Sequence, residues 1–190
     1  MTVLETERLS LRPMRRDDAK PLMRLFGDPF FMESFGRGPF DESEMSAWVA
    51  RNLAHQEQHG YGLFTIVLRR SEQVIGDCGL EVMELEGERE VELGYDLRRD
   101  LWGNGYATEA ALAVVEHAFG QLGLHRLVSM IRVGNSRSAR VAERLGMVRE
   151  ASVSLGVRYE RYALGAPSTR PGQGRRSVTE RSADRSHPKR

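Results

Sequence analysis

The sequence contains a single cysteine, Cys78, which excludes an internal disulfide and any zinc cluster built from cysteines. As a small apolar residue in an expected strand, it is interpreted as part of the core. No apolar run is long enough to span a bilayer and there is no signal-peptide pattern, so no membrane partner is expected and the expected location is cytoplasmic. His55 and His59 lie four residues apart without a third ligand nearby, so no metal is expected.

The net charge is small but unevenly distributed. The chain has 28 Lys and Arg against 27 Asp and Glu, a net +1. Residues 166–190 hold seven basic and two acidic residues, so the remaining 1–165 hold 21 and 25, a net −4. The 166–190 segment is polar and rich in Pro, Gly and Ser, and is predicted to be a disordered basic tail after one domain over 1–165. Two interpretations stay open: a solvated extension, or a loose contact with RNA or another polyanion.

Hydrophobic periodicity predicts a mixed α/β layer fold in the order β-α-α-β-β-β-α-β-α-β-β. A strand is expected over 3–12, a helix from an Asp17 cap to Gly27, and a loop over 28–40. The remaining expected elements are a helix over 41–59, strands over 61–68 and 73–82, an acidic loop over 84–89, a strand ending at Leu97, a helix over 105–120, a strand over 124–132, a helix from Asn135 to Gly146, and strands over 147–154 and 157–164.

The stretch after Leu97 carries the strongest functional signal. A strand, a loop with the sequence Trp102-Gly103-Asn104-Gly105, and a helix follow one another. The first turn of a helix has unsatisfied N–H groups and a partial positive charge, and glycine lets them approach a ligand closely. This order therefore favours a phosphate-binding loop, although a tight turn with no ligand has the same residues.

Two common nucleotide motifs are absent. A P-loop needs Gly-Lys-Ser/Thr, and the residue after Gly105 is Tyr106, which excludes a P-loop NTPase. A Rossmann fingerprint needs a third glycine where Thr108 stands, and it occurs on the first strand of its fold, whereas this loop lies past the middle of the chain.

Three blocks together resemble the GNAT superfamily of N-acetyltransferases, in its RimJ/RimL-like branch. The segment Trp102-Gly103-Asn104-Gly105-Tyr106-Ala107 is similar to the coenzyme-A loop Gln/Arg-x-x-Gly-x-Gly/Ala, with tryptophan first as in that branch. The segment from Asn135 to Met147 looks like the branch's Asn-x-x-Ser helix that ends in Leu-Gly-Phe, and residues 4–13 are similar to its first strand. The resemblance covers residues 3–164.

The resemblance implies a GNAT fold with a mostly antiparallel central sheet and acetyl-CoA as co-substrate. It also implies that the strand ending at Leu97 parts from the strand over 127–132, and that the pantetheine arm enters this gap as an extra strand would. Gly94 is expected to form a bulge there. The residues expected to contact acetyl-CoA are Tyr95, Leu97, Trp102, Gly103, Asn104, Gly105, Tyr106, Ala107, Thr108, Asn135 and Ser138. Arg98 and Arg99 are either phosphate contacts or exposed loop residues.

The catalytic groups follow from the same resemblance. A primary amine is mostly protonated at neutral pH, so a base is needed, and Glu92 beside the gap is the first candidate, with Asp77 and Glu81 as alternatives. A backbone N–H of Leu93 or Gly94 is expected to stabilise the oxyanion. Many GNAT enzymes place a tyrosine where this chain has Ala142. A serine can take that role in the RimL-like branch, and Ser138 fits the position.

The expected function is N-acetyl transfer from acetyl-CoA to a primary amine by direct attack in a ternary complex. The acceptor is either a protein N-terminus or a small amine, and the loop with Phe30, Phe31, Phe35 and Phe40 is expected to border its pocket. The alternative is a non-catalytic acyl-CoA-binding module that contacts RNA through the tail. Otherwise no nucleic-acid partner is expected. Analogy with the family suggests a homodimer.

Overall fold

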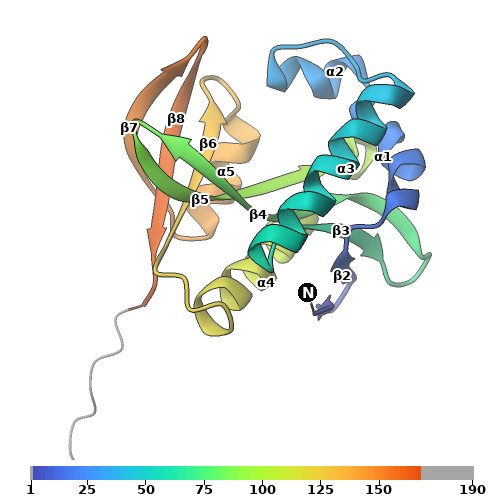
Figure 1. The fold of residues 1–190 in the computed structure, drawn as a ribbon, viewed down its shortest axis with the longest axis horizontal. Helices are drawn as coiled ribbons and strands as arrows, with labels where there is room; N and C mark the ends of the chain where they lie inside the picture. The colour runs from blue at the N-terminus through green and yellow to red at the C-terminus, as the bar shows by residue number, and fades with distance from the viewer. Residues whose placement is uncertain (1, 168–190) are drawn as a thin grey trace, which may run out of the picture.

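The computed structural model describes residues 2–167 as one eight-stranded sheet with helices on both faces. Figure 1 shows β6, β7 and β8 gathered at one end of the sheet and β2 and β3 at the other. The strands are β1 (Leu4–Glu5), β2 (Leu9–Pro13), β3 (Leu63–Leu68), β4 (Gln73–Leu85), β5 (Glu88–Leu97), β6 (Arg126–Arg132), β7 (Val148–Leu155) and β8 (Val157–Gly165). The helices are α1 (Ala19–Phe26), α2 (Pro29–Met32), α3 (Glu42–His59), α4 (Tyr106–Gly120) and α5 (Ser136–Arg144), with short 3-10 turns η1 (Arg16–Asp18), η2 (Glu33–Phe35) and η3 (Arg99–Leu101).

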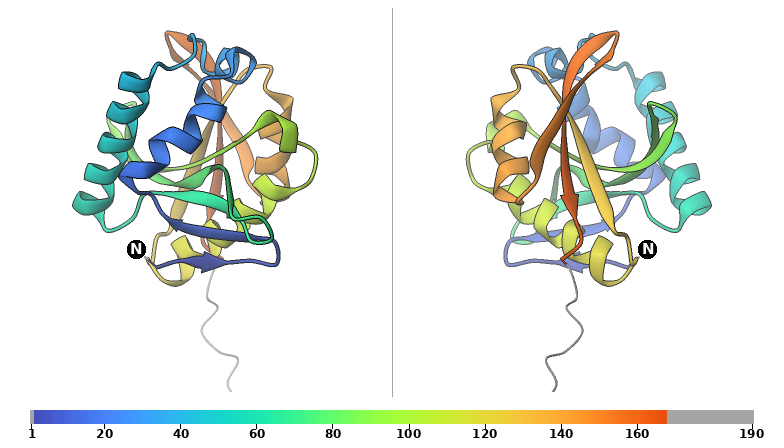
Figure 2. Two further views of the ribbon diagram at one scale, coloured as in Figure 1. Left: turned by 90° about the vertical axis from the view of Figure 1, so that its right-hand side faces the viewer. Right: turned by 90° about the vertical axis from the view of Figure 1, so that its left-hand side faces the viewer.

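The two faces of the sheet carry different cores. Figure 2 shows α1 and α3 on one side of the sheet and α5 on the other. Alternate strand positions such as Cys78, Leu80 and Leu93 pack with the buried alanines and valine of α4. The opposite face is covered by α1 and α3, which contribute Leu22 and Met45 to a second cluster. Because strand side chains alternate between faces, the neighbours of Cys78 and Leu93 face α1 and α3.

The sheet runs in the order β1-β2-β3-β4-β5-β6-β8-β7, and only β5 and β6 pair in parallel. That pair consists of one backbone bridge, Glu92 to Val128. All other neighbouring strands are antiparallel. The expected parting of these two strands is therefore present, and the sheet opens on the side toward Leu97 and Arg132.

The hairpin of β4 and β5 fixes the positions of the central polar residues. Its turn is Glu86–Gly87, and both residues have positive φ, 54° and 84°. Two consecutive positive φ values are typical of the tight two-residue turns that match the twist of a hairpin. From this turn the register runs without a break from Leu85↔Glu88 to Gly76↔Leu97. The expected acidic loop over 84–89 is therefore wrong, because strand pairing continues to the turn itself.

Two further expectations about the N-terminal third are wrong. The strand expected over 3–12 is divided, because the Thr6 hydroxyl and N–H groups bond to Leu9 and turn the chain between β1 and β2. The loop expected over 28–40 contains α2 and η2, since Asp28 accepts from the Phe30 N–H and caps a short helix. The cap before α1 is assigned to Asp18 rather than Asp17.

The other elements agree with the sequence within a few residues, and the expected mixed, mostly antiparallel sheet flanked by helices is confirmed. Asp41 and Glu44 form a capping box at the start of α3. Asn135 accepts from the Ser138 N–H at the start of α5, and Gly146 follows that helix with a φ of 83°. Cys78 is fully buried. The predicted disordered tail over 166–190 lies outside the described residues except for its first two positions.

Candidate active site

A cavity of about 620 Å³ lies where β5 and β6 diverge, bounded by the loop after β5 and the first turns of α4 and α5. Its volume is in the range of small-molecule sites. Ten of the eleven residues expected to contact acetyl-CoA line it: Tyr95, Leu97, Trp102, Gly103, Gly105, Tyr106, Ala107, Thr108, Asn135 and Ser138. The eleventh, Asn104, does not line the cavity. Its amide donates to the carbonyls of Leu101 and Trp102, at 3.0 and 3.2 Å, and shapes the loop from within.

The glycine loop presents free N–H groups to this cavity. Gly103 and Gly105 have φ values of 80° and 81°, a conformation that glycine adopts without strain. The first intrahelical bond of α4 runs from the Glu109 N–H to the Gly105 carbonyl, and no side chain caps the helix. The N–H groups of Gly105 to Thr108 therefore have no partner within the helix. The Thr108 hydroxyl is also buried without a partner among the described residues.

Arg8, from the turn between β1 and β2, holds the loop from outside. Its guanidinium donates to the Asn104 carbonyl at 2.9 Å, forms an ion pair with Glu109 at 2.5 Å, and lies 4.5 Å from the centre of the Tyr106 ring. Glu109 also accepts from the Thr6 hydroxyl. No local pattern predicts this contact, because about a hundred residues separate Arg8 from its partners.

Basic side chains form part of the cavity wall. The arginines that line it are Arg132, Arg137, Arg140 and Arg144. Three of them lie three or four residues apart on α5, so they share a side of that helix. This spacing is visible in the sequence and predicts a basic side of the helix, although these arginines were not expected at the site. Of the two expected arginines, Arg98 forms an ion pair with Asp100, whereas Arg99 lies over the ring of Phe30, which lines the cavity.

Backbone direction decides which amides of β5 face the gap. The Leu93 carbonyl accepts from the Ser129 hydroxyl of β6 at 2.7 Å, so Leu93 points its backbone groups toward β6. In a strand, successive residues point them to opposite neighbours, so Gly94 faces β4 and Tyr95 faces the gap. Gly94 is paired with Gly79 in unbroken register. The expected bulge at Gly94 is therefore wrong, and the Gly94 N–H does not face the gap. The Leu93 N–H faces β6 but is used in the Glu92–Val128 bridge, so the N–H left to face the gap is that of Tyr95, which was expected only as a coenzyme-A contact.

Glu92 lies at the bridge itself, half-buried on the face toward α1 and α3. One carboxylate oxygen accepts from the Met130 N–H at 3.2 Å. Burial raises the pKa of Glu92 to about 7, opposed by this hydrogen bond and assisted by the charge of Glu81. A carboxylate with this pKa exchanges protons readily at neutral pH, which suits a general base.

Three other carboxylates lie on the same face. Glu81 is directly opposite Glu92, and Asp77 is directly opposite Asp96. Burial raises the pKa of Glu81, and Arg51 of α3 lowers it in part. Burial and the nearby carboxylates also raise the pKa values of Asp77 and Asp96. Asp96 lines the cavity, although the sequence did not single it out.

On the other side of the gap, β5 is tied to α5. The Tyr95 hydroxyl donates to the Ser138 carbonyl at 2.8 Å, and burial raises the pKa of this phenol. Ser138 is half-buried at the cavity wall. Of the expected aromatic loop, Phe30 and Phe31 line the cavity, whereas the Phe35 and Phe40 rings pack on Phe26.

A GNAT acetyltransferase domain model matches residues 8–148. The chain belongs to the GNAT acetyltransferase family. The uncharacterized protein YkkB of Bacillus subtilis is 35% identical over 147 residues, which is 77% of this chain and 85% of that protein. The uncharacterized N-acetyltransferase p20 of Bacillus licheniformis is 30% identical over 151 residues, 79% of this chain and 84% of its own length. The protein is therefore an acyltransferase of this family.

Solved structures show the same fold. An acetyltransferase from Agrobacterium tumefaciens superposes with a TM-score of 0.75 at 33% identity, over 86% of this chain and 94% of its own. RimL, a ribosomal L7/L12 α-N-protein acetyltransferase solved in complex with coenzyme A, gives a TM-score of 0.74 at 18% identity, over 86% and 98%. GNAT acetyltransferases use acetyl-CoA. The RimJ/RimL branch remains a prediction, since most named relatives are uncharacterized.

Residues 2–167 contain no group of three or more His, Cys, Asp or Glu side chains arranged to hold a metal ion. His55 and His59 stack with ring centroids 4.4 Å apart. None of the helices in this part of the chain has the length and apolar character needed to cross a membrane.

Proposed function

We propose that this protein transfers the acetyl group of acetyl-CoA to a primary amine by direct attack in a ternary complex. The observation that carries the proposal is the cavity at the single-bridge opening between β5 and β6. It joins unpaired helix amides and arginines on one side of the sheet to Asp96, which belongs to the face with the carboxylates; Glu92 lies beside the cavity at the bridge. A donor and an acceptor can therefore meet within the sheet.

The residues present fit acetyl-CoA. The amides of Gly105 to Thr108 and the buried, unpartnered Thr108 hydroxyl offer donors to a pyrophosphate. The α5 arginines add positive charge for phosphate groups. Beyond Leu93, the edge of β5 that faces the gap offers backbone groups to an extended pantetheine arm. The cavity lies over this edge.

Bound acetyl-CoA supplies an electrophilic thioester carbonyl. Glu92 accepts the proton of the acceptor ammonium, which leaves a neutral amine to attack that carbon. The Tyr95 N–H donates to the oxygen as it becomes negative, and such a donor typically contributes about 3 kcal/mol. The carbon–sulfur bond then breaks as the Ser138 hydroxyl donates its proton to the departing thiolate. The second proton of the amine nitrogen returns to Ser138, and the proton held by Glu92 is released to solvent. The products are an acetamide and free coenzyme A.

The acceptor is a protein N-terminus or a small amine. The structural neighbour RimL, named for acetylating a ribosomal protein, supports the protein N-terminus. The alternative of a non-catalytic acyl-CoA-binding module depends on the 166–190 tail. Intact acetyl-CoA affinity without turnover, together with salt-sensitive RNA binding lost on deleting the tail, would favour it.

The test is release of free thiol from acetyl-CoA in the presence of a panel of amines and peptide N-termini, with mass spectrometry of the products. Wild-type protein is expected to consume acetyl-CoA only when an acceptor is present. The proposal fails if the protein binds neither acetyl-CoA nor another acyl-CoA, or if it binds them and acetylates none of the acceptors.

A further inference from the structure

The face of the sheet toward α1 and α3 carries two opposed pairs of acids, Glu81 with Glu92 and Asp77 with Asp96. Residues directly opposite each other in an antiparallel pair project to the same face with their Cβ atoms about 5 Å apart. Like charges in this position are destabilising, so two such pairs in one hairpin need a compensating role. The pairs are four residues apart along β5, about 13 Å at about 3.3 Å per residue.

The surface of the sheet between the two acid pairs carries no side chain. The positions between them are Gly79 and Gly94, which also lie opposite each other. A Cβ at Gly79 would come within 2.3 Å of the Gly62 carbonyl oxygen, so that glycine is required by a neighbouring backbone. A Cβ at Gly94 would meet no atom within 4 Å. Over Gly94 there is therefore room for a slender chain running from one acid pair to the other.

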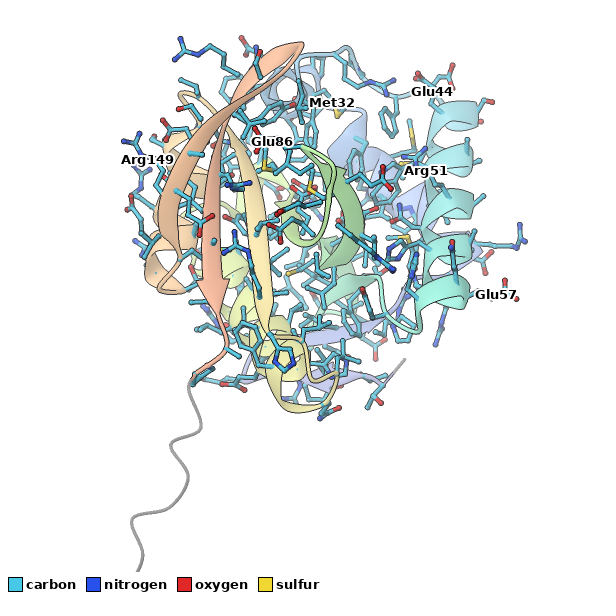
Figure 3. All side chains as sticks on the ribbon, turned by 60° about the vertical axis from the view of Figure 1, so that its left-hand side comes forward. Met32, Glu44, Arg51, Glu57, Glu86 and Arg149 are labelled. Atoms are coloured by element: carbon cyan, nitrogen blue, oxygen red, sulfur yellow. The ribbon has the colours of Figure 1, made fainter. Side chains whose placement is uncertain are left out.

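Apart from Arg51, which acts on Glu81 through its charge, the cations on this face are committed to other partners. Arg12 pairs with Asp18 at 2.5 Å, and Asp18 also accepts from Thr65 beside Asp77. Arg126 pairs with Glu90 and Glu150, and Arg161 with Glu86 and Glu150. Figure 3 shows Arg51 on α3, across from the β4–β5 turn that carries Glu86. None of the four paired acids forms an ion pair with a side chain among residues 2–167.

Asp77 gives an independent indication of a missing partner. Only 1% of this residue is exposed, and its Oδ2 atom has no hydrogen-bond partner among the described residues. A buried polar atom without a partner destabilises the folded state, and such atoms are few in native structures. Its cross-strand neighbour Asp96 lines the cavity, so a donor that reaches Asp96 from the cavity also approaches Asp77.

We infer that the acceptor is an extended aliphatic amine with a second cationic group: the reacting nitrogen lies at Glu92 and Glu81, and the far ammonium at Asp96 and Asp77. This rests on the proposed function and narrows its acceptor. The slender chain between the two nitrogens passes over Gly94. A peptide N-terminus carries its first side chain directly beside the reacting nitrogen and does not in general offer a second cation at this distance.

Matched acceptors test the inference directly. Wild-type enzyme with saturating acetyl-CoA is assayed with α,ω-diaminoalkanes of four to ten carbons, with n-alkylamines of the same lengths, and with peptides. The expected result is a kcat/KM at least about tenfold higher for a diamine than for the alkylamine of equal length, because each factor of ten needs only about 1.4 kcal/mol. The preference is expected to peak at an intermediate length.

Two variants locate the far ammonium. Asp96→Asn is expected to reduce kcat/KM for the preferred diamine, through KM, about tenfold more than it reduces kcat/KM for the equal-length alkylamine, so that the preference for the diamine is lost. Gly94→Val fills the open space above Gly94 and is expected to lower kcat/KM for both the diamine and the alkylamine. The matched control is Glu88→Gln, which removes an exposed carboxylate at the start of β5. It is expected to leave kcat/KM for the diamine and for the alkylamine unchanged.

The outcomes separate the two proposals. Equal kcat/KM for diamines and alkylamines, or better turnover of peptides, overturns the cationic acceptor while acetyl transfer stands. A diamine preference that Asp96→Asn leaves intact overturns the assignment of the far ammonium to Asp96 and Asp77. Absence of turnover with every amine, although acetyl-CoA binds, instead counts against the proposed function. The wild-type comparison does not depend on any variant folding.

Discussion

The Met130 N–H donates to the Glu92 carboxylate over 3.2 Å, two residues beyond the single bridge that joins β5 to β6. A side chain thus supplies the acceptor that a neighbouring strand would supply in a continuous ladder. This contact keeps Glu92 at the opening, and burial there raises its pKa to about 7. One carboxylate both completes the edge of β6 and is suited to take a proton.

Replacing Glu92 with Gln is expected to abolish most turnover, because the amide cannot accept the proton of an ammonium. In the wild type, kcat/KM should rise as the pH increases through about 7, where Glu92 loses its proton. The variant should lack this limb of the pH profile. Stopped or continuous thiol-release assays between pH 6 and 9 measure both. Unchanged turnover and an unchanged limb in the variant would exclude Glu92 as the base.

The same variant is expected to be more stable than the wild type above pH 7. The pKa of Glu92 is raised from 4.5 to about 7 on folding, so the folded state is penalised as the pH rises between these values. The full penalty is about 3 kcal/mol at about 1.4 kcal/mol per pKa unit, and glutamine removes it while keeping an acceptor for Met130. Urea denaturation at pH 5 and pH 8 measures the difference, which should be larger at pH 8. A variant that is less stable at pH 8 contradicts the buried position of the charge.

Gly105→Asp is expected to abolish acetyl-CoA binding. An aspartate at a φ of 81° costs about 1–2 kcal/mol in backbone strain, and its charge faces the phosphates beside the free amides. Calorimetric titration with coenzyme A measures the loss. The matched control is Gly60→Asp, which places the same residue at a φ of 75° in open space after α3. It should cost similar stability and leave the affinity unchanged. Equal losses in both variants would attribute the effect to strain alone.

Arg8→Gln is expected to weaken coenzyme A binding by about three- to tenfold without lowering kcat at saturating acetyl-CoA. The arginine fixes the loop through the Asn104 carbonyl and Glu109, and a net contribution of about 1 kcal/mol to loop order appears as affinity. Arg24→Gln, an exposed arginine on α1, is the control and should have no effect. A fall in kcat with affinity intact would place Arg8 in the chemistry instead.

His55 is expected to make stability fall on acidification. Its Nδ1 lies 3.1 Å from the Tyr61 carbonyl, and its Nε2 accepts from the Val82 N–H at 2.9 Å, so the neutral ring with a proton on Nδ1 satisfies both partners. Burial lowers its pKa below 6.5. The unfolded chain therefore takes up a proton before the folded one, and stability is lost as the pH falls through 6.5. Thermal unfolding of wild type and His55→Asn at pH 7.5 and 5.5 should show a smaller pH effect in the variant.

The sequence predicted the features that depend on neighbouring residues. Gly103, Gly105 and the helix after them form a local pattern, and Asn135 with Gly146 delimits α5 by local capping. The acid pairs escaped prediction because they depend on strand register. Asp77 and Asp96 are 19 positions apart, and only the Glu86–Gly87 turn makes them opposite. Reading that turn as a two-residue hairpin would have predicted both pairs. The contact of Arg8 with Asn104 and Glu109 joins residues about a hundred positions apart, so no local sequence pattern predicts it.

The single bridge between β5 and β6 divides the sheet into two antiparallel parts, β1 to β5 and β6 to β8, that are joined by one backbone pairing. Beyond that bridge the two parts are coupled by α4, which links them in sequence, by the Tyr95 contact with α5, and by side-chain contacts such as those of Ser129 with Leu93 and of Glu92 with Met130. A bound molecule that offers strand-like donors and acceptors in the gap adds the missing pairings. Amide hydrogens of β6 and α5 should then exchange more slowly when coenzyme A is present. Binding of the substrate would in that case increase the stability of the domain against local opening.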